Sequence, residues 1–299
     1  MMSIVKNFVV AALAIAATSI FADAGEWDFT KGTAPAGGEL RGVAQLTAKG
    51  ITVADISDWK SFCKALENAL DRFVQGGCRA ATQSVLPAVF SRPNEYHAAL
   101  YFEKALAGEI LAPNELALYQ AQLWRVLSAA YTARDMTLAL CVGETPAKSE
   151  TNNPVSGDFF AKATRELLDY LKERVGLPRV AAYVEQAALI PAVAALAGRY
   201  PAITEGVPQI ALGVWQGAPA DTRAQLRALA SVTSLSACVG AMPDMRLPLS
   251  PWAGEIFRRT LCAELADWEA HGEICSGEEN LCQVVTKLAG ANMREYYKL

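Results

Sequence analysis

An acidic and a basic residue follow a short apolar run in the last quarter of the chain. Residues 243–246, which include Asp244 and Arg246, come directly after residues 236–242, which are predicted to form a buried strand. A carboxylate there can act as a general base or ligate a metal, and an arginine can hold a carboxylate through two parallel hydrogen bonds. In an α/β barrel this is the edge that carries the chemistry. An ordinary ion pair that fixes a loop would give the same pattern.

The other residue types that often carry chemistry are few or scattered. The 299 residues include only two histidines, and both are predicted to be structural. His97 falls in a predicted helix at 94–106, and His271 lies beside Gly272 at the end of another at 254–272, where a cation complements the helix dipole. The sequence has no glycine-rich phosphate loop, no HExxH zinc motif and no GxSxG nucleophile elbow.

The cysteines indicate a compartment rather than a site. There are seven of them, an odd number, and no pair has CxxC spacing. This pattern argues against a zinc ribbon or a thioredoxin-like motif, and it favours buried or free thiols in a reducing compartment over a disulfide framework. A local disulfide between Cys275 and Cys282 is the alternative.

The composition excludes several classes of protein. Hydrophobic residues make up 52% of the chain and charged residues 19%, enough for a large core and incompatible with a disordered or collagen-like chain. Lys and Arg number 27 against 31 Asp and Glu, a net charge of −4, and no basic block occurs. Nucleic acid is therefore not expected as a partner.

The elements that must position Asp244 and Arg246 alternate between strand and helix. Amphipathic periodicity and glycine stops predict helices, one of them with Asn114 as its N-cap, at 58–75, 94–106, 114–134, 159–175, 220–229 and 254–272. Short apolar runs predict strands at 40–46, 137–142, 208–215 and 236–242, and a strand followed by a helix within 180–200. This alternation is typical of a parallel sheet with crossover helices.

The first 24 residues have two interpretations. Lys6 precedes an apolar run at 8–20, and small residues at 22 and 24 follow it, as in a secretory signal peptide. The run is shorter than the roughly 20 residues that span a bilayer, so no membrane span is expected. The same run could instead be a buried strand of a parallel sheet.

Three C-terminal segments, residues 255–262, 268–273 and 292–297, resemble the C-terminus of the uronate (glucuronate) isomerase family. Their spacing from Asp244 and Arg246 matches as well, and segments further upstream, including 140–143 and 209–215, fall in the family's order. The resemblance extends over about residues 58–299 and is most specific in the last 60 or so.

The resemblance implies a fold and a reaction. The family belongs to the amidohydrolase superfamily and has a (β/α)8 TIM barrel, so residues 25–299 are expected to form one α/β barrel-like domain. The barrel is expected to be incomplete, without the first strand and the helical insertion. Residues 1–24 would then supply a barrel strand. The family's reaction is an aldose–ketose isomerisation of hexuronates, D-glucuronate to D-fructuronate, in glucuronate catabolism.

The resemblance also assigns residues. Asp244 takes the catalytic role and a metal-ligand role, while Arg246 and Trp215 contact the sugar acid. The family's zinc is held by two histidines of the first strand, one of the fifth strand and the aspartate of the eighth. Cys141 occupies the position at which the family has its fifth-strand histidine. Thr82 and Gln83 occupy the positions at which the family has an Asp–His pair. Asp244 and Cys141 alone fall short of the three protein ligands of a catalytic zinc.

Three hypotheses remain for the function: an active isomerase, a catalytically inactive homologue that binds a sugar acid or a partner chain, and a truncated reading frame. Because an incomplete barrel has open sheet edges, pairing with a second copy or another chain is expected. With the run at 8–20 in the barrel, the protein is expected to be cytoplasmic. It would be secreted or periplasmic if residues 1–24 are a signal peptide.

Overall fold

A computed structural model describes residues 20–22, 56–85, 94–107, 109–143, 157–216, 219–243, 250–274 and 277–299. The predicted strand at 40–46, most of the apolar run at 8–20, Asp244, Arg246 and Cys275 lie outside this description. The chain divides into two compact units. The first contains the described residues up to Gln83, those of 88–136, and Tyr170–Gly176, and the second contains the rest.

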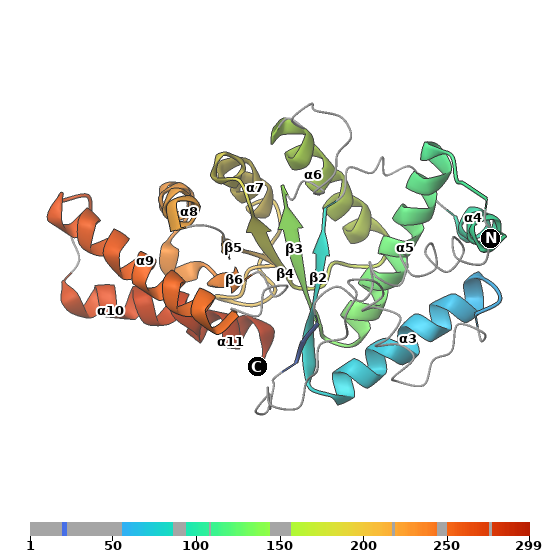
Figure 1. The fold of residues 1–299 in the computed structure, drawn as a ribbon, viewed down its shortest axis with the longest axis horizontal. Helices are drawn as coiled ribbons and strands as arrows, with labels where there is room; N and C mark the ends of the chain where they lie inside the picture. Colours follow the sequence, from blue (N-terminus) through green and yellow to red (C-terminus); the bar gives the residue numbers. More distant parts are fainter. Residues whose placement is uncertain are drawn as a thin grey trace. The chain divides into compact units, whose positions relative to one another are not determined.

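The first unit is built mainly of three helices, all of which the periodicity predicted. They are α3 (Trp59–Gln75), α4 (Glu95–Leu106) and α5 (Pro113–Ala133) (Figure 1). Their packed faces bring the rings of Trp59, Phe62 and Phe102 within 5.0–6.0 Å of one another. Strand β1 (Ile20–Ala22) pairs antiparallel with β2 (Cys78–Ser84) in the same unit.

The start of α5 differs from the prediction. The N-cap is Ala112, and Asn114 lies inside the first turn, so the assignment of Asn114 as the cap is wrong. Pro113 takes the first helical position, where its missing N–H costs no hydrogen bond. Glu115 then supplies the polar cap, because its carboxylate accepts the N–H of Ala112 at 2.9 Å and pairs with Lys104 at 2.8 Å.

The second unit contains a parallel sheet with its crossover helices. Its strands, in spatial order, are β3 (Thr137–Val142), β4 (Val180–Val184), β5 (Ile210–Gln216) and β6 (Ala241–Pro243). The helices that alternate with them are α6 (Gly157–Arg174), α7 (Ile190–Ala197), α8 (Pro219–Val232) and α9 (Ser250–Ala270), and the last five residues of α6 belong to the first unit. Strand and helix alternate as the sequence predicted, and the fold is an incomplete, TIM-barrel-like α/β fold.

The chain ends in a group of short helices after α9. These are α10 (Glu278–Thr286), a π-helical turn η4 (Lys287–Ala291) and α11 (Asn292–Tyr297) (Figure 1). Two 3-10 turns lie earlier, η2 (Ala187–Leu189) and η3 (Leu235–Ala237). None of the helices in the described part of the chain is long and apolar enough to cross a membrane.

Strand β6 is shorter than the predicted strand at 236–242, because its expected first half is not extended. Residues 235–237 form the turn η3, and Gly240 has a φ of +95°. The space at Gly240 also requires glycine, because a Cβ there would lie 2.7 Å from the carbonyl oxygen of Leu288. The start of β6 is therefore set by the close approach of Leu288 to Gly240. The local sequence pattern cannot reveal this contact.

The ladder between β3, β4 and β5 fixes which residues share a face. Cys141, Tyr183 and Gly213 are aligned across the three strands. Val142 and Val184 follow one residue later, are aligned in turn, and are at most 1% exposed. Because side chains alternate between the faces of a sheet, the valines point to the face opposite Cys141 and Tyr183.

The structure describes six of the seven cysteines, and none of these six, Cys282 included, is in a disulfide. For the described cysteines, this agrees with the prediction of thiols rather than a disulfide framework.

Candidate functional site

Of the predicted site residues, the structure describes Trp215 in β5 and Cys141 in β3. Trp215 is the second-last residue of β5, partly exposed, and aligned with Met242 of β6. Asp244 and Arg246 follow β6 in the sequence and lie outside the described residues. The roles assigned to Asp244, Arg246 and Trp215 therefore stay predictions.

One carboxylate at these strand ends was not found by the sequence analysis. The N–H of Glu185 donates to the carbonyl of Val142 at 2.9 Å, so the ladder continues one residue past the end of β4. Alternation then puts Glu185 on the same face as Tyr183. Glu185 is partly exposed. A single acidic residue directly after an apolar run is the only signal for it in the sequence.

A buried glutamine of α8 joins two of the strand ends. Gln225 is only 1% exposed. Its Oε1 accepts a hydrogen bond from the N–H of Trp215 at 2.8 Å, and its Nε2 donates one to the carbonyl of Glu185 at 3.1 Å. Sequence reasoning missed it, although a signal exists. Gln225 lies on the apolar side of the helix, three and four residues from Thr222 and Leu229, which are also buried.

A second glutamine makes a similar link on the neighbouring strands. Gln186, two residues after β4, donates through Nε2 to the carbonyl of Gly143 at 3.4 Å. Gly143 follows β3 with a φ of +94°, which a side chain would strain. Side-chain amides thus connect the carboxyl ends of β3, β4 and β5.

Cys141, the second-last residue of β3, is buried and lies near a pair of buried tyrosine hydroxyls. The Tyr183 and Tyr297 hydroxyls are 2.8 Å apart, and both residues are at most 3% exposed. Burial raises the pKa of both phenols, and the neighbouring Cys141 thiol raises the pKa of each further. Both tyrosines are therefore neutral at physiological pH and act here as hydrogen-bonding groups.

The residues at the family's zinc positions do not fit a zinc ion as far as the structure describes them. Among the described residues, no group of three or more His, Cys, Asp or Glu side chains could hold a metal. Gln83, at a position where the family has an acid–base pair, is buried and donates to the Tyr131 hydroxyl at 3.2 Å.

The two histidines lie in or directly after helices, at the positions that the sequence indicated. In α4 the ring of His97 lies nearly parallel to that of Tyr101, with centroids 6.0 Å apart. His271 follows the last residue of α9, and its Nδ1 lies 2.8 Å from the carbonyl oxygen of Asp267.

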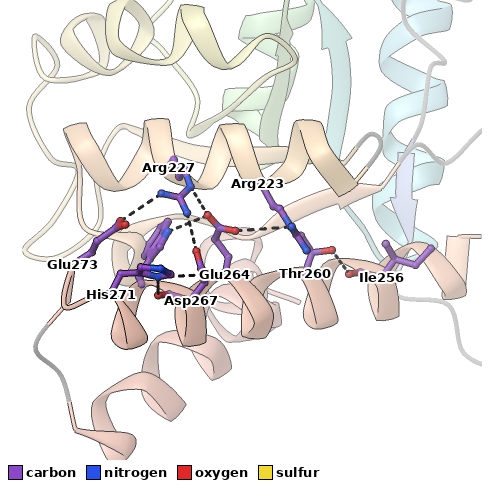
Figure 2. Close-up of polar contacts among 9 residues, drawn as sticks. Arg223, Arg227, Ile256, Thr260, Glu264, Asp267, His271 and Glu273 are labelled. Carbon is purple, nitrogen blue, oxygen red and sulfur yellow. Dashed lines mark hydrogen bonds and ion pairs between the residues drawn. The ribbon is translucent and has the colours of Figure 1, made fainter.

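Helix α8, which carries Gln225, is held against α9 by a charged cluster (Figure 2). Glu264 of α9 is only 4% exposed at its side chain and pairs with Arg227 at 2.5 Å. The same arginine also pairs with Asp267 and Glu273, at 3.2 and 3.4 Å. The indole N–H of Trp268 donates to Glu264 at 3.0 Å. The buried carboxylate is thus paired and hydrogen-bonded, as a charge in that position requires.

The parallel strands, their alternating helices and the polar residues at the strand ends define a barrel-type α/β protein. A family model described as glucuronate isomerase matches residues 43–297. The chain belongs to the glucuronate isomerase family. This agrees with the resemblance seen in the sequence.

Individual relatives agree with the family match. The chain is 28% identical to a uronate isomerase of Shouchella clausii over 257 residues, which are 81% of this chain and 54% of the relative. It is 28% identical to a uronate isomerase of Streptococcus agalactiae over 266 residues, 83% of this chain and 56% of the relative. The chain thus spans about half the length of the curated relatives it matches.

Solved structures show the same fold. The uronate isomerase of Thermotoga maritima superposes with a TM-score of 0.65 at 22% identity, over 80% of this chain and 54% of the other. The glucuronate isomerase of Caulobacter crescentus gives a TM-score of 0.60 at 18% identity, over 80% of this chain and 51% of the other.

The buried tyrosine pair gives a test of the described cluster. We expect Tyr183→Phe and Tyr297→Phe each to lower the free energy of unfolding by about 1–3 kcal/mol, because each leaves the other hydroxyl without its partner. The double variant should cost less than the sum of the two single changes. Urea unfolding of all three measures this. Tyr96→Phe, at a residue 72% exposed, is the control and should change stability little. Strict additivity would contradict the pairing.

Proposed function

We propose that the protein to which this chain belongs interconverts a hexuronate with its keto form, in the sense of D-glucuronate to D-fructuronate. The observation that carries the proposal is the family match over residues 43–297, which includes the strand ends around Trp215 and the predicted pair Asp244 and Arg246. The chain covers about half of the length of its relatives, so only some of the residues that the reaction needs are assigned to it.

An aldose–ketose isomerisation needs three things from a protein. The carboxylate of the sugar acid must be held, and Arg246 is suited to this because guanidinium and carboxylate form two parallel hydrogen bonds. A proton must leave C2 and arrive at C1, for which Asp244 is the proposed general base. The sugar must also be oriented, and Trp215 offers a flat apolar surface at the end of β5.

Two substitutions test these roles. Purified chain is incubated with D-glucuronate and with D-galacturonate, and ketose formation is followed. We expect Asp244→Asn to lower kcat by about 100-fold or more, because a general base is removed. Arg246→Lys should raise KM about tenfold, because the two parallel hydrogen bonds to the carboxylate are lost.

Matched controls are available on exposed helix positions. Glu269→Gln in α9 removes a carboxylate, as Asp244→Asn does, and Arg165→Lys in α6 replaces a guanidinium with an ammonium, as Arg246→Lys does. Both control residues are exposed, and neither change should alter turnover. Absence of turnover above buffer in the unchanged chain, with either sugar acid, would contradict the proposed activity. Saturable binding without turnover would instead indicate the inactive sugar-acid-binding homologue.

We also propose that the protein is cytoplasmic. The six described cysteines support this, because none of them is in a disulfide and thiols persist in reducing compartments. N-terminal sequencing of the natural protein tests it, and we expect residues 1–24 to be retained in the mature protein. A mature protein that starts at Gly25 would show signal cleavage and overturn the proposal.

A further inference from the structure

We propose that Gln225 is a positioning residue, which sets the position of Trp215 at the carboxyl end of the sheet and so the fit of the sugar acid. The inference rests on the proposed function, since it concerns how the same site holds its substrate. Gln225 need not touch the substrate. Its effect is exerted through the backbone of the residue that does.

The hydrogen bonds of Gln225 carry the argument. One carboxamide accepts from the Trp215 N–H at 2.8 Å and donates to the Glu185 carbonyl at 3.1 Å. A carboxamide has an acceptor and a donor at one end, a combination that neither a carboxylate nor an apolar side chain offers. Because both partners are backbone groups, the side chain spans the ends of β4 and β5 and fixes one relative to the other.

The ladder explains why this link lies on the side of β5 that faces β4. The N–H of Val214 donates to the carbonyl of Gly240, on the side of β6. Successive N–H groups of a strand point to opposite neighbours, so the N–H of Trp215 points towards β4. Gln225 meets it there, next to Glu185, the first residue after β4.

The helix that carries Gln225 gives it a rigid support. Two residues further along α8, Arg227 is paired with the buried Glu264 of α9, and its guanidinium lies 5.6 Å from the ring centre of Trp268 (Figure 2). A residue that positions a site must itself be locked in place by such contacts. The paired helices α8 and α9 satisfy that condition.

A matched control exists at the opposite end of the same strand. Gln209 directly precedes β5, and its Nε2 donates to the carbonyls of Leu177 and Pro178 at 2.9 and 2.6 Å. It is also a side-chain amide that links backbone groups in this unit, but it lies at the amino end of the strand. Substitution of Gln209 should therefore disturb folding without disturbing the carboxyl ends.

The experiment compares Gln225→Met with Gln209→Met in the full chain. Three quantities are measured: kcat and KM with D-glucuronate, the urea midpoint, and the hydrogen-exchange rate of the Trp215 amide. We expect both variants to lower the urea midpoint. Only Gln225→Met should lower kcat/KM, by about 10- to 100-fold through a higher KM, because small misplacements of a binding group are costly. It should also speed exchange of the Trp215 amide.

A conservative variant keeps the test decisive if Gln225→Met folds poorly. In its protonated form, the side chain of Gln225→Glu keeps both an acceptor for the Trp215 N–H and a donor for the Glu185 carbonyl, so towards low pH this variant should keep more of kcat/KM than Gln225→Met and slower exchange at Trp215. The inference would be overturned if the Gln225 and Gln209 variants lost kcat/KM equally, or if the Gln225 variants kept unchanged kinetics. In either case, turnover by the unchanged chain would still support the proposed function. No turnover by the unchanged chain would overturn both.

Discussion

The structure of the second unit depends on the register of its parallel strands. The ladder aligns Cys141 with Tyr183 and Tyr183 with Gly213, and it puts the valines that follow on the other face. Since side chains alternate with a period of two, a slip of one residue would exchange the valines with the polar cluster. Gly213 depends on the same register, because a Cβ there would collide with the Tyr183 ring. The positions of Glu185 and Trp215 follow from it.

The C-terminal segment supports the strands from the end opposite to the proposed site. The hydroxyl of Tyr296 donates to the Val180 carbonyl at 2.9 Å, where β4 begins, and lies 3.1 Å from the carbonyl oxygen of Gln209, before β5. The amide of Asn292 donates to the carbonyls of Ser236 and Cys238 at 2.7 and 2.8 Å, ahead of β6. In the motif at 292–297, which carried much of the family resemblance, Asn292 and Tyr296 thus hold the starts of the strands.

Periodicity in the sequence predicted most of the described elements because their patterns are local. Helix α3, for example, follows from Asp58 as its cap and from apolar residues on one side. The start of β6 could not be predicted, because the conformation of Gly240 depends on Leu288, 48 positions later in the chain. Gln225 was missed for a related reason, since a glutamine in an amphipathic helix is usually at the surface. Only the tertiary structure shows that its partners are the backbones of two strand ends.

We propose that the carboxyl ends of β5 and β6 bind a hexuronate, and a crystal structure of the chain with D-glucuronate tests this most directly. We expect the sugar carboxylate to lie against the guanidinium of Arg246 and the sugar ring to pack on Trp215, with the Gln225 amide bonded to the Trp215 backbone. A sugar acid bound away from these residues, or no sugar acid at saturating concentration, would contradict the claim.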